Sequence, residues 1–211
     1  IQKRGKTPII CGGTGFWIQA LVENNPFPAV KPNPTLRKKL EKLSAEKLFQ
    51  QLKKQDPRRA KTIDPKNKIR LIRALEICES LGTVPTPQHS TFNIQHSHIL
   101  IVLNPSQETL WNNITVRLEK RMKIGMIAEV ERLRTEGISW KRLESFGLEY
   151  KYVALFLQKK ISKDEMTERL NFEIRHYAKR QLTWLRRFEK TTPLHWITDP
   201  SEAFIILKDV P

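Results

Sequence analysis

The strongest constraint on the fold is an amphipathic segment near the end of the chain, residues 169–187 (RLNFEIRHYAKRQLTWLRR). Its apolar residues recur at the spacing of one helix face: Leu170, Ile174, Ala178, Leu182 and Leu185. Side chains three or four positions apart share a face of an α-helix. The pattern therefore predicts a long helix that packs this apolar stripe against a core.

Cations and aromatic side chains flank this stripe. Arg175, Lys179 and Arg186 form one line, and His176, Arg180, Trp184 and Arg187 form its neighbour. Such a surface suits a polyanion with exposed bases, because cations contact phosphates while rings and guanidinium planes stack on bases. The alternative is a solvated basic face with Tyr177 and Trp184 at the rim of the core, and the helix alone does not decide between the two.

The charge balance supports a polyanionic partner. The 211 residues contain 38 Lys and Arg against 22 Asp and Glu, a net charge of +16 that is spread along the chain. Such a field favours nucleic acid or anionic membranes. No apolar run approaches the roughly 20 residues that span a bilayer, and no signal peptide opens the chain. Cys11 and Cys78 are too few for a disulfide framework, so we expect a cytoplasmic protein.

The N-terminal residues follow an α/β pattern. An apolar run, Thr7–Cys11, predicts a buried parallel strand, and the turn Gly12-Gly13-Thr14-Gly15 separates it from a helical pattern over Phe16–Val22. Backbone amides at a helix N-terminus can hold an anion. The same glycines could serve only the geometry of a tight turn.

A helical insertion is expected between two core segments. We place the domains at residues 1–28 (core), 29–95 (insertion) and 96–211 (core continuation), with proline-containing links over 24–34 and 83–96. Within the insertion, the residues from Pro34 to Ile63 are basic and helical, with Leu36, Leu40, Leu43 and Leu48 on the apolar side. A second helix ends near Gly82 and turns Ile69, Ile72, Leu75 and Ile77 inward. Its Arg70 and Arg73 either straddle successive phosphates or form an ion pair with Glu76.

The remaining residues are mostly helical. We expect strands at 98–103 and 195–198, helices at 106–124, 126–135, 147–158 and 163–189, and a terminal helix from Pro200. The histidines are scattered, and neither HExxH nor CxxC is present, so no zinc or other metal site is predicted from this chain's own residues.

Together these segments resemble the tRNA dimethylallyltransferases, also called tRNA isopentenyltransferases. The matching stretches are GKTPIICGGTGFWIQALV, DPKNKIRLIRALEI, RLEKRMKIGMIAEVERL, FGLEYKYVALFLQKKIS and IRHYAKRQLTWLRRF, followed by LHWI, in the family's order. The resemblance implies an α/β fold with a P-loop NTPase-like core, here an incomplete parallel sheet rich in helices, and a helical insertion domain.

The resemblance also implies an activity. Members transfer a dimethylallyl group from dimethylallyl diphosphate to N6 of the adenine 3′ of the anticodon, in tRNAs reading codons that begin with U. The implied partners are the tRNA anticodon stem-loop and dimethylallyl diphosphate, with Mg²⁺ as the cofactor and no membrane. The resemblance also implies an ATP-binding type of nucleotide-binding fold, and we expect a monomer. A non-catalytic RNA-binding module on the same scaffold is the alternative, and a P-loop kinase relative is a weaker one.

The resemblance assigns roles residue by residue. Thr14 and Arg117 match catalytic positions, and Gly12 and Gly13 join them along the diphosphate and substrate channel. The tRNA-contacting positions are Arg37, Arg70, Arg73, Phe146, Gly147, Tyr150, Lys151, Lys179, Arg180, Gln181, Trp184 and Arg186.

Two departures from the family pattern stand out. Glu149 replaces the family's glycine before Tyr150, which puts backbone contacts at that point in doubt. In the family, a phosphate loop and an Asp-Ser segment that carries the presumed general base precede the GGTG strand, and neither is present here. We therefore expect a C-terminal part of a longer protein, with the Mg²⁺ ligands in the preceding segment, and no prenyl transfer by these 211 residues alone.

Overall fold

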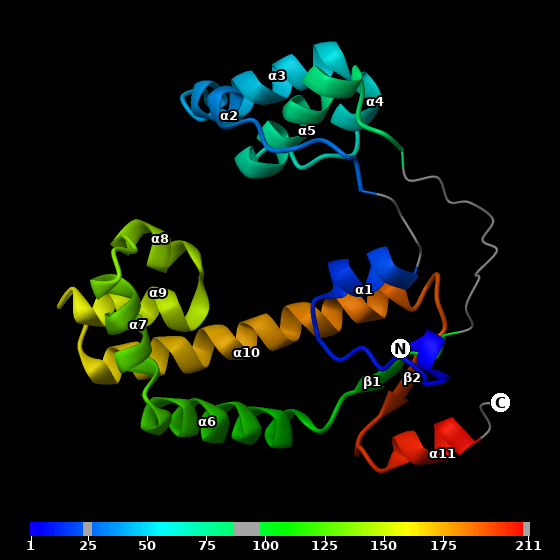
Figure 1. Cartoon of the computed structure of the whole chain (residues 1–211), viewed down its shortest axis with the longest axis vertical. Coiled ribbons are helices and arrows are strands. Elements are labelled where there is room, and N and C mark those ends of the chain that lie inside the picture. Colours follow the sequence, from blue (N-terminus) through cyan, green and yellow to red (C-terminus); the bar gives the residue numbers. More distant parts are fainter. Residues whose placement is uncertain (23–26, 87–97, 209–211) are drawn as a thin grey trace. The chain divides into compact units, whose positions relative to one another are not determined.

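The computed structural model describes residues 1–22, 27–86 and 98–208. It divides into two compact units: unit 1 comprises residues 1–18 and 96–211, and unit 2 comprises residues 19–95 (Figure 1). Most of the predicted link over 83–96, and the first three residues of the link over 24–34, lie outside the described residues. The domain boundaries expected from the sequence remain a prediction.

Unit 2 is a small helical bundle. Its helices are α2 (Pro34–Leu40), α3 (Ala45–Gln55), α4 (Pro57–Ala60) and α5 (Lys68–Leu81). The stretch predicted as helical from Pro34 is thus divided into three helices, because Ser44 and Asp56 each accept a hydrogen bond from a backbone amide at a new helix start. Gly82 ends α5 with φ of 79°, as predicted.

The core of unit 2 lies between α3 and α5. Leu40 and Leu48 are buried, with Leu36 and Leu43 packed against the cluster, as the sequence predicts. On α5, Ile72, Leu75 and Ile77 are buried. The inward placement of Ile69 is wrong, since its side chain is 82% exposed. It lies in the first turn of α5, and the core cluster on that helix begins only at Leu71.

Unit 1 contains most of the remaining elements. A 3-10 turn (Gln2–Arg4) precedes α1 (Gly15–Val22), and these are followed after unit 2 by β1 (Ile101–Leu103), α6 (Gln107–Ile124), α7 (Met126–Thr135), α8 (Trp140–Ser145), α9 (Leu148–Leu157), α10 (Lys163–Phe188), β2 (His195–Ile197) and α11 (Glu202–Lys208). The helices and strands expected after residue 98 are confirmed to within three residues. Only α8 was not predicted, because six residues are too few to show a helical period.

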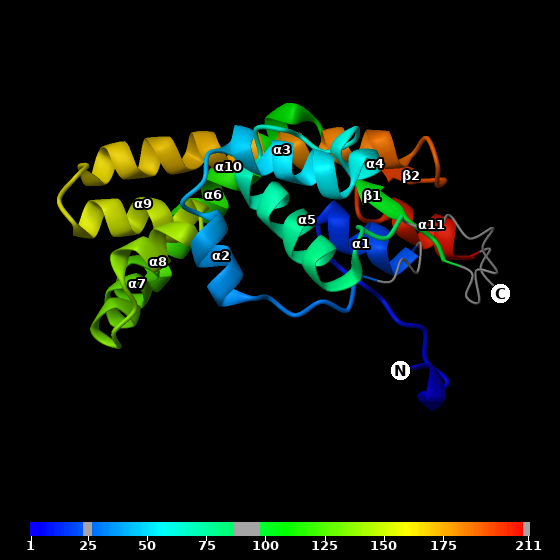
Figure 2. The same cartoon turned by 90° about the horizontal axis from the view of Figure 1, so that it is seen from above.

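Helix α10 organises unit 1. Ser162 and Glu165 close a capping box at its start, and α7, α8 and α9 gather around its N-terminal half (Figures 1 and 2). Leu170 of the predicted stripe is fully buried there, and Ile174 packs against the same cluster. Farther along, Leu182 and Leu185 are only half-buried. The stripe is thus a core face in its first half and a partly covered face in its second.

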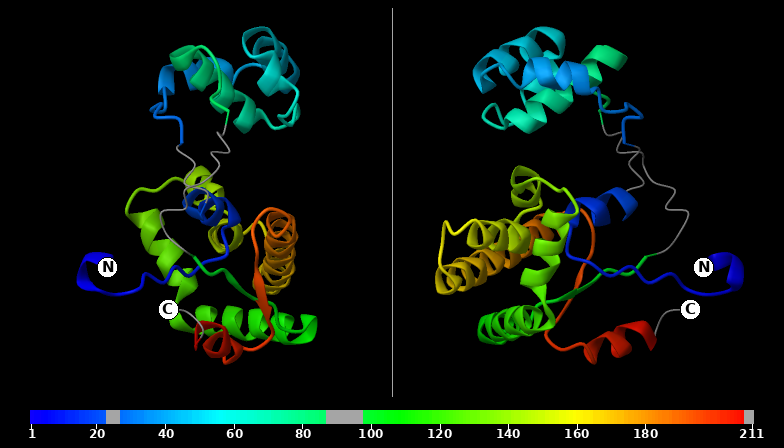
Figure 3. Two further views of the ribbon diagram at one scale, coloured as in Figure 1. Left: turned by 90° about the vertical axis from the view of Figure 1, so that its right-hand side faces the viewer. Right: turned by 60° about the vertical axis from the view of Figure 1, so that its left-hand side comes forward.

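The sheet is parallel and small. Strand β1 pairs with β2, with Ile101 opposite His195 and Leu103 opposite Ile197. Strand β2 and then α11 follow the C-terminal end of α10 (Figure 3). The buried strand predicted at Thr7–Cys11 is wrong for the described residues: Ile9 and Ile10 are 81% and 65% exposed. A strand needs a hydrogen-bonded neighbour, and the sheet formed by the described residues consists of β1 and β2.

None of the helices in the described ranges is long and apolar enough to cross a membrane.

Candidate nucleic-acid interface

The GGTG turn lies against the C-terminal half of α10. A Cβ atom placed on Gly13 would meet the side chain of Gln181, and one placed on Gly15 would fall within the indole ring of Trp184. A Cβ on Gly12 would meet nothing. The fold therefore brings together two segments that are more than 160 residues apart. The resemblance assigns the first to the substrate channel and the second to tRNA contact.

Trp184 is held from two sides. Its ring stacks on that of the buried Phe188, with centroids 4.9 Å apart and planes at 28°, and Gly15 also lies against the ring. It therefore lies at the rim of the core, as the second interpretation of this helix supposed. Tyr177 is 37% exposed, and the Arg180 guanidinium lies 5.7 Å from its ring centroid. This pair keeps one aromatic and one cationic group at the surface.

Two cations of α10 share one ring of α6. The Arg175 guanidinium and the Lys179 ammonium lie 5.0 and 5.3 Å from the centroid of Trp111. Arg175 and Asn171 both donate to Thr115 Oγ1, at 3.3 and 2.9 Å. Neither Trp111 nor Thr115 was predicted from the sequence as a site residue. Their i,i+4 spacing on a predicted helix indicates that the two side chains share a helix face. It does not indicate which other helix that face contacts.

Thr14 and Arg117 are both exposed, in the loop and on α6 respectively. The Thr14 carbonyl accepts from the amides of Trp17 and Ile18, at 3.0 and 3.3 Å, and so starts α1. Within the described ranges, no hydrogen bond or ion pair joins Thr14 to Arg117. Arg186 is also exposed, on the last turn of α10.

The FGLEYK segment forms the start of α9. Gly147 has φ of 82°, a conformation that suits glycine, and Phe146 stays 46% exposed beneath the Arg142 guanidinium. Tyr150 packs edge-on against Phe146, and its hydroxyl donates to Glu129 Oε1 at 2.7 Å. This hydrogen bond to a carboxylate raises the pKa of Tyr150. Lys151 is exposed and lies near the ring of Tyr152.

Glu149 has a defined partner. Its carboxylate accepts from Arg121 Nη1 at 2.5 Å, and the side chain is only 17% exposed. The pair connects α6 to α9. The residue that departs from the family pattern thus turns toward the protein interior and stabilises the helix packing.

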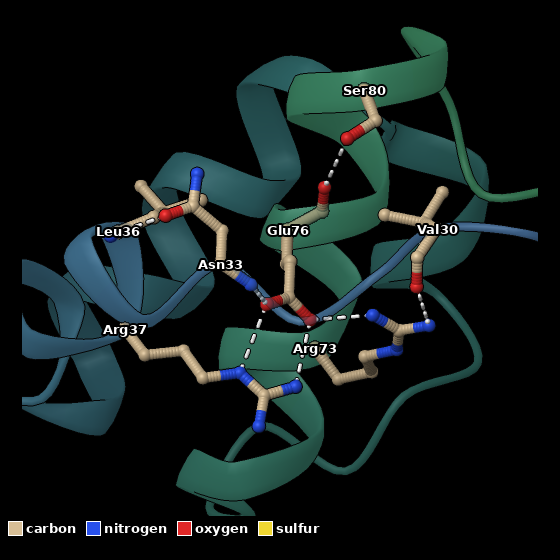
Figure 4. Close-up of polar contacts among 7 residues, drawn as sticks. All are labelled: Val30, Asn33, Leu36, Arg37, Arg73, Glu76 and Ser80. Carbon is tan, nitrogen blue, oxygen red and sulfur yellow. Dashed lines mark hydrogen bonds and ion pairs between the residues drawn. The ribbon is translucent and has the colours of Figure 1, made fainter.

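Unit 2 places Arg37 and Arg73 around a buried carboxylate, that of Glu76 (Figure 4). Arg37 donates through Nε and Nη2 at 2.9 and 2.8 Å, and Arg73 donates through Nη1 at 2.5 Å. The amide of Asn33 completes the set at 2.5 Å, and Arg73 Nη2 also donates to the Val30 carbonyl at 2.9 Å.

Arg70 and Arg73 therefore differ. Arg73 forms the ion pair with Glu76, the second of the two interpretations of this pair. Arg70 is exposed, and its guanidinium takes part in no ion pair within the described residues. The i,i+3 spacing indicated Glu76 as a possible partner of Arg73, but no local pattern indicated Arg37, which lies 39 positions from Glu76 in the chain.

The Glu76 cluster should make unit 2 acid-labile. Hydrogen bonds from Arg37, opposed by burial and assisted by Asn33 and Arg73, lower the pKa of Glu76 from 4.5 to about 2. Because the folded-state pKa is depressed, the stabilisation is complete above pH 4.5 and is lost as the pH falls toward 2, and it amounts to roughly 3 kcal/mol. We expect the protection factors of the α5 amides, which are corrected for the intrinsic pH dependence of hydrogen exchange, to fall over this range.

The variant Glu76→Gln supplies the control. Asp56 of unit 2 also has a lowered pKa, because its hydrogen bonds from the amides of Arg59 and Val84 outweigh the effect of burial. The difference between the wild-type and variant pH profiles isolates the contribution of Glu76. If the stability of the wild type and of Glu76→Gln changed equally with pH below pH 4.5, the depressed pKa of Glu76 would be contradicted.

Comparisons with known proteins agree with this architecture. The family model "IPP transferase" matches residues 1–188. The chain is 39% identical over 193 residues to tRNA dimethylallyltransferase 1 of Syntrophus aciditrophicus, covering 90% of this chain and 62% of that protein. The structure of the full-length tRNA isopentenylpyrophosphate transferase of Bacillus halodurans aligns with a TM-score of 0.60 at 27% identity, covering 98% of this chain and 66% of that one.

A third comparison supports the fold alone. The structure of a eukaryotic dimethylallyltransferase acting on tRNA aligns with a TM-score of 0.74 at 23% identity, over 99% of this chain and 57% of that one. These alignments define the fold class: a helix-rich protein with a small parallel sheet, of the P-loop NTPase-like type found in tRNA isopentenyltransferases. The chain belongs to the IPP transferase family. It spans 62% and 64% of the length of the curated relatives that it matches first.

Proposed function

We propose that the protein transfers a dimethylallyl group from dimethylallyl diphosphate to N6 of the adenine 3′ of the anticodon in tRNAs reading UNN codons. The proposal rests on family membership together with one observation. The GGTG turn packs directly on the Gln181 and Trp184 side chains of a basic helix. This contact supports the proposal, because it joins the loop proposed to hold the small substrate to the helix proposed to face the RNA.

The proposed roles follow from position and charge. The target adenine must leave the anticodon stack to reach the prenyl donor, and the exposed Thr14 hydroxyl lies at the loop that would receive it. Cleavage of the carbon–oxygen bond leaves negative charge on diphosphate, which cations stabilise; Arg117 is the proposed cation. Lys179, Arg180 and Arg186 supply positive charge along α10 for the tRNA backbone.

The resemblance also implies Mg²⁺. Within the described ranges, no group of three or more His, Cys, Asp or Glu side chains could hold a metal ion. Mg²⁺ is usually bound through one or two carboxylates together with substrate phosphates, and none of the proposed roles depends on a metal site formed by these residues alone. A reducing cytoplasm is proposed as well, on the ground that Cys11 and Cys78 are both free thiols. A monomer is a separate proposal.

Labelled dimethylallyl diphosphate tests the activity. Incubated with tRNA and Mg²⁺, the protein at its natural length should label the adenine next to the anticodon. A tRNA with guanosine at that position is the matched control and should stay unlabelled. Salt-sensitive binding of the anticodon arm without incorporation would favour the RNA-binding module, and absence of both would reject the proposal.

A further inference from the structure

The Glu76 carboxylate has all of its acceptor positions filled. Its side chain is 1% exposed, and its oxygens accept four hydrogen bonds: from Asn33 and Arg37 at Oε1, and from Arg37 and Arg73 at Oε2 (Figure 4). A buried charge is tolerated when it is paired and fully hydrogen-bonded. Glu76 is therefore fixed in place by three separate residues.

The two arginines remain partly at the surface. The Arg37 and Arg73 side chains are 38% and 34% exposed, although both bond to the same Oε2 atom. Each guanidinium has five N–H donors in a rigid plane, and the bonds to Glu76 and Val30 use only some of them. The cluster carries two positive charges against one negative charge, and the exposed Arg70 lies one turn earlier on α5.

We propose that Glu76 is a positioning residue for RNA binding by unit 2: it holds Arg37 and Arg73 as a preformed pair of guanidinium groups for RNA phosphates. This inference rests on the proposed function, since it assumes that the protein binds an anticodon arm. A free arginine loses side-chain freedom when it binds a phosphate, and a side chain that is already fixed loses less.

The direction in which one substitution changes RNA affinity distinguishes a positioning role of Glu76 from a simple effect of its charge. Glu76→Gln removes a negative charge, so long-range electrostatics alone predicts tighter binding to a polyanion. Loss of positioning predicts weaker binding, because the amide has one acceptor oxygen for four donors and the guanidinium groups become mobile. The two explanations therefore predict opposite changes in affinity.

The experiment measures the affinity of an anticodon stem-loop RNA by fluorescence anisotropy across a salt series. We expect Glu76→Gln to weaken RNA binding about tenfold. The slope of log K against log salt should also fall, by an amount equivalent to the loss of roughly one to two phosphate contacts. The matched control is Glu79→Gln, which removes the same charge from an exposed position on the same helix. It should bind as tightly as the wild type or more tightly.

A purely structural role is tested separately. Hydrogen exchange of α5 reports whether unit 2 stays folded in Glu76→Gln, and Glu76→Asp, which keeps the carboxylate, should recover part of both affinity and salt slope. If the α5 amides of Glu76→Gln lose their protection from hydrogen exchange, the variant Arg37→Lys is measured instead. It keeps the positive charge but loses the two hydrogen bonds from Arg37 to Glu76, and it should also bind the RNA more weakly than the wild type.

The failures are distinguishable. If the wild type binds the RNA and folded Glu76→Gln binds it as well or better, the positioning role is overturned and the proposed function stands. If the replacement variant Arg37→Lys binds as tightly as the wild type, the positioning role is likewise overturned. If the wild type shows no salt-sensitive binding, the proposed function itself fails.

Discussion

Replacing Gly15 by alanine is expected to lower prenyl transfer by about a hundredfold while tRNA binding stays within a few fold. The added methyl group would overlap the indole ring of Trp184, which is stacked on the buried Phe188. The GGTG turn must then shift away from α10. A displacement of about 1 Å of a reacting group can cost a factor of roughly 10² in rate.

Two neighbouring glycines provide the controls. Gly12→Ala adds the same methyl group where no other protein atom lies within 4 Å, so it should reduce transfer far less than Gly15→Ala, even though Gly12 borders the proposed channel. Gly13→Ala meets only the flexible Gln181 side chain and should have an intermediate effect. Single-turnover transfer and RNA affinity are measured on all three variants. Equal activities of the Gly12 and Gly15 variants would show that the contact with Trp184 does not position the turn.

Arg73→Ala is expected to destabilise unit 2 by about 2–4 kcal/mol, and Arg70→Ala by less than about 0.5 kcal/mol. Removing Arg73 deprives the buried Glu76 of one donor and leaves the Val30 carbonyl without its hydrogen bond. The exposed Arg70 has no such partner within the described residues. Arg70→Ala should instead reduce the salt slope of RNA binding by about one.

The choice of probe matters for this pair. All five tryptophans (Trp17, Trp111, Trp140, Trp184 and Trp196) lie in unit 1, so tryptophan fluorescence does not report on unit 2. Hydrogen exchange of α5 measures the local stability instead. Equal protection in the two variants would mean that the Arg73–Glu76 pair contributes nothing measurable. Tryptophan fluorescence then serves as the internal control, because unit 1 should melt alike in both.

Local patterns predicted the helices well and the contacts between them poorly. The stripe from Leu170 to Leu185 predicts α10 because helix periodicity depends on residues three or four apart. The same spacing misplaced Ile69, because periodicity shows which face of a helix is apolar but not how far the neighbouring elements extend. Thr7–Cys11 has the composition of a strand, yet a strand also requires a neighbour, and no local signal supplies one.

The candidate site shows the same division. The glycines of the GGTG turn and the cations of α10 were identified from residue types at short spacing, and the family assignment followed from the order of such segments. Gly15 and Trp184 are 169 positions apart, and Arg37 is 39 positions from Glu76. The pair of Arg73 with Glu76, by contrast, is local, at i,i+3.

By itself, the amino-acid sequence determined which segments are helical, how basic their surfaces are and to which family the chain belongs, because these properties depend on neighbouring residues and their order. Tertiary structure decided which cations are held by a buried carboxylate and which stay free, and which glycine must lack a side chain. Burial and hydrogen bonding arise only when distant segments pack together, so these choices are made by the fold.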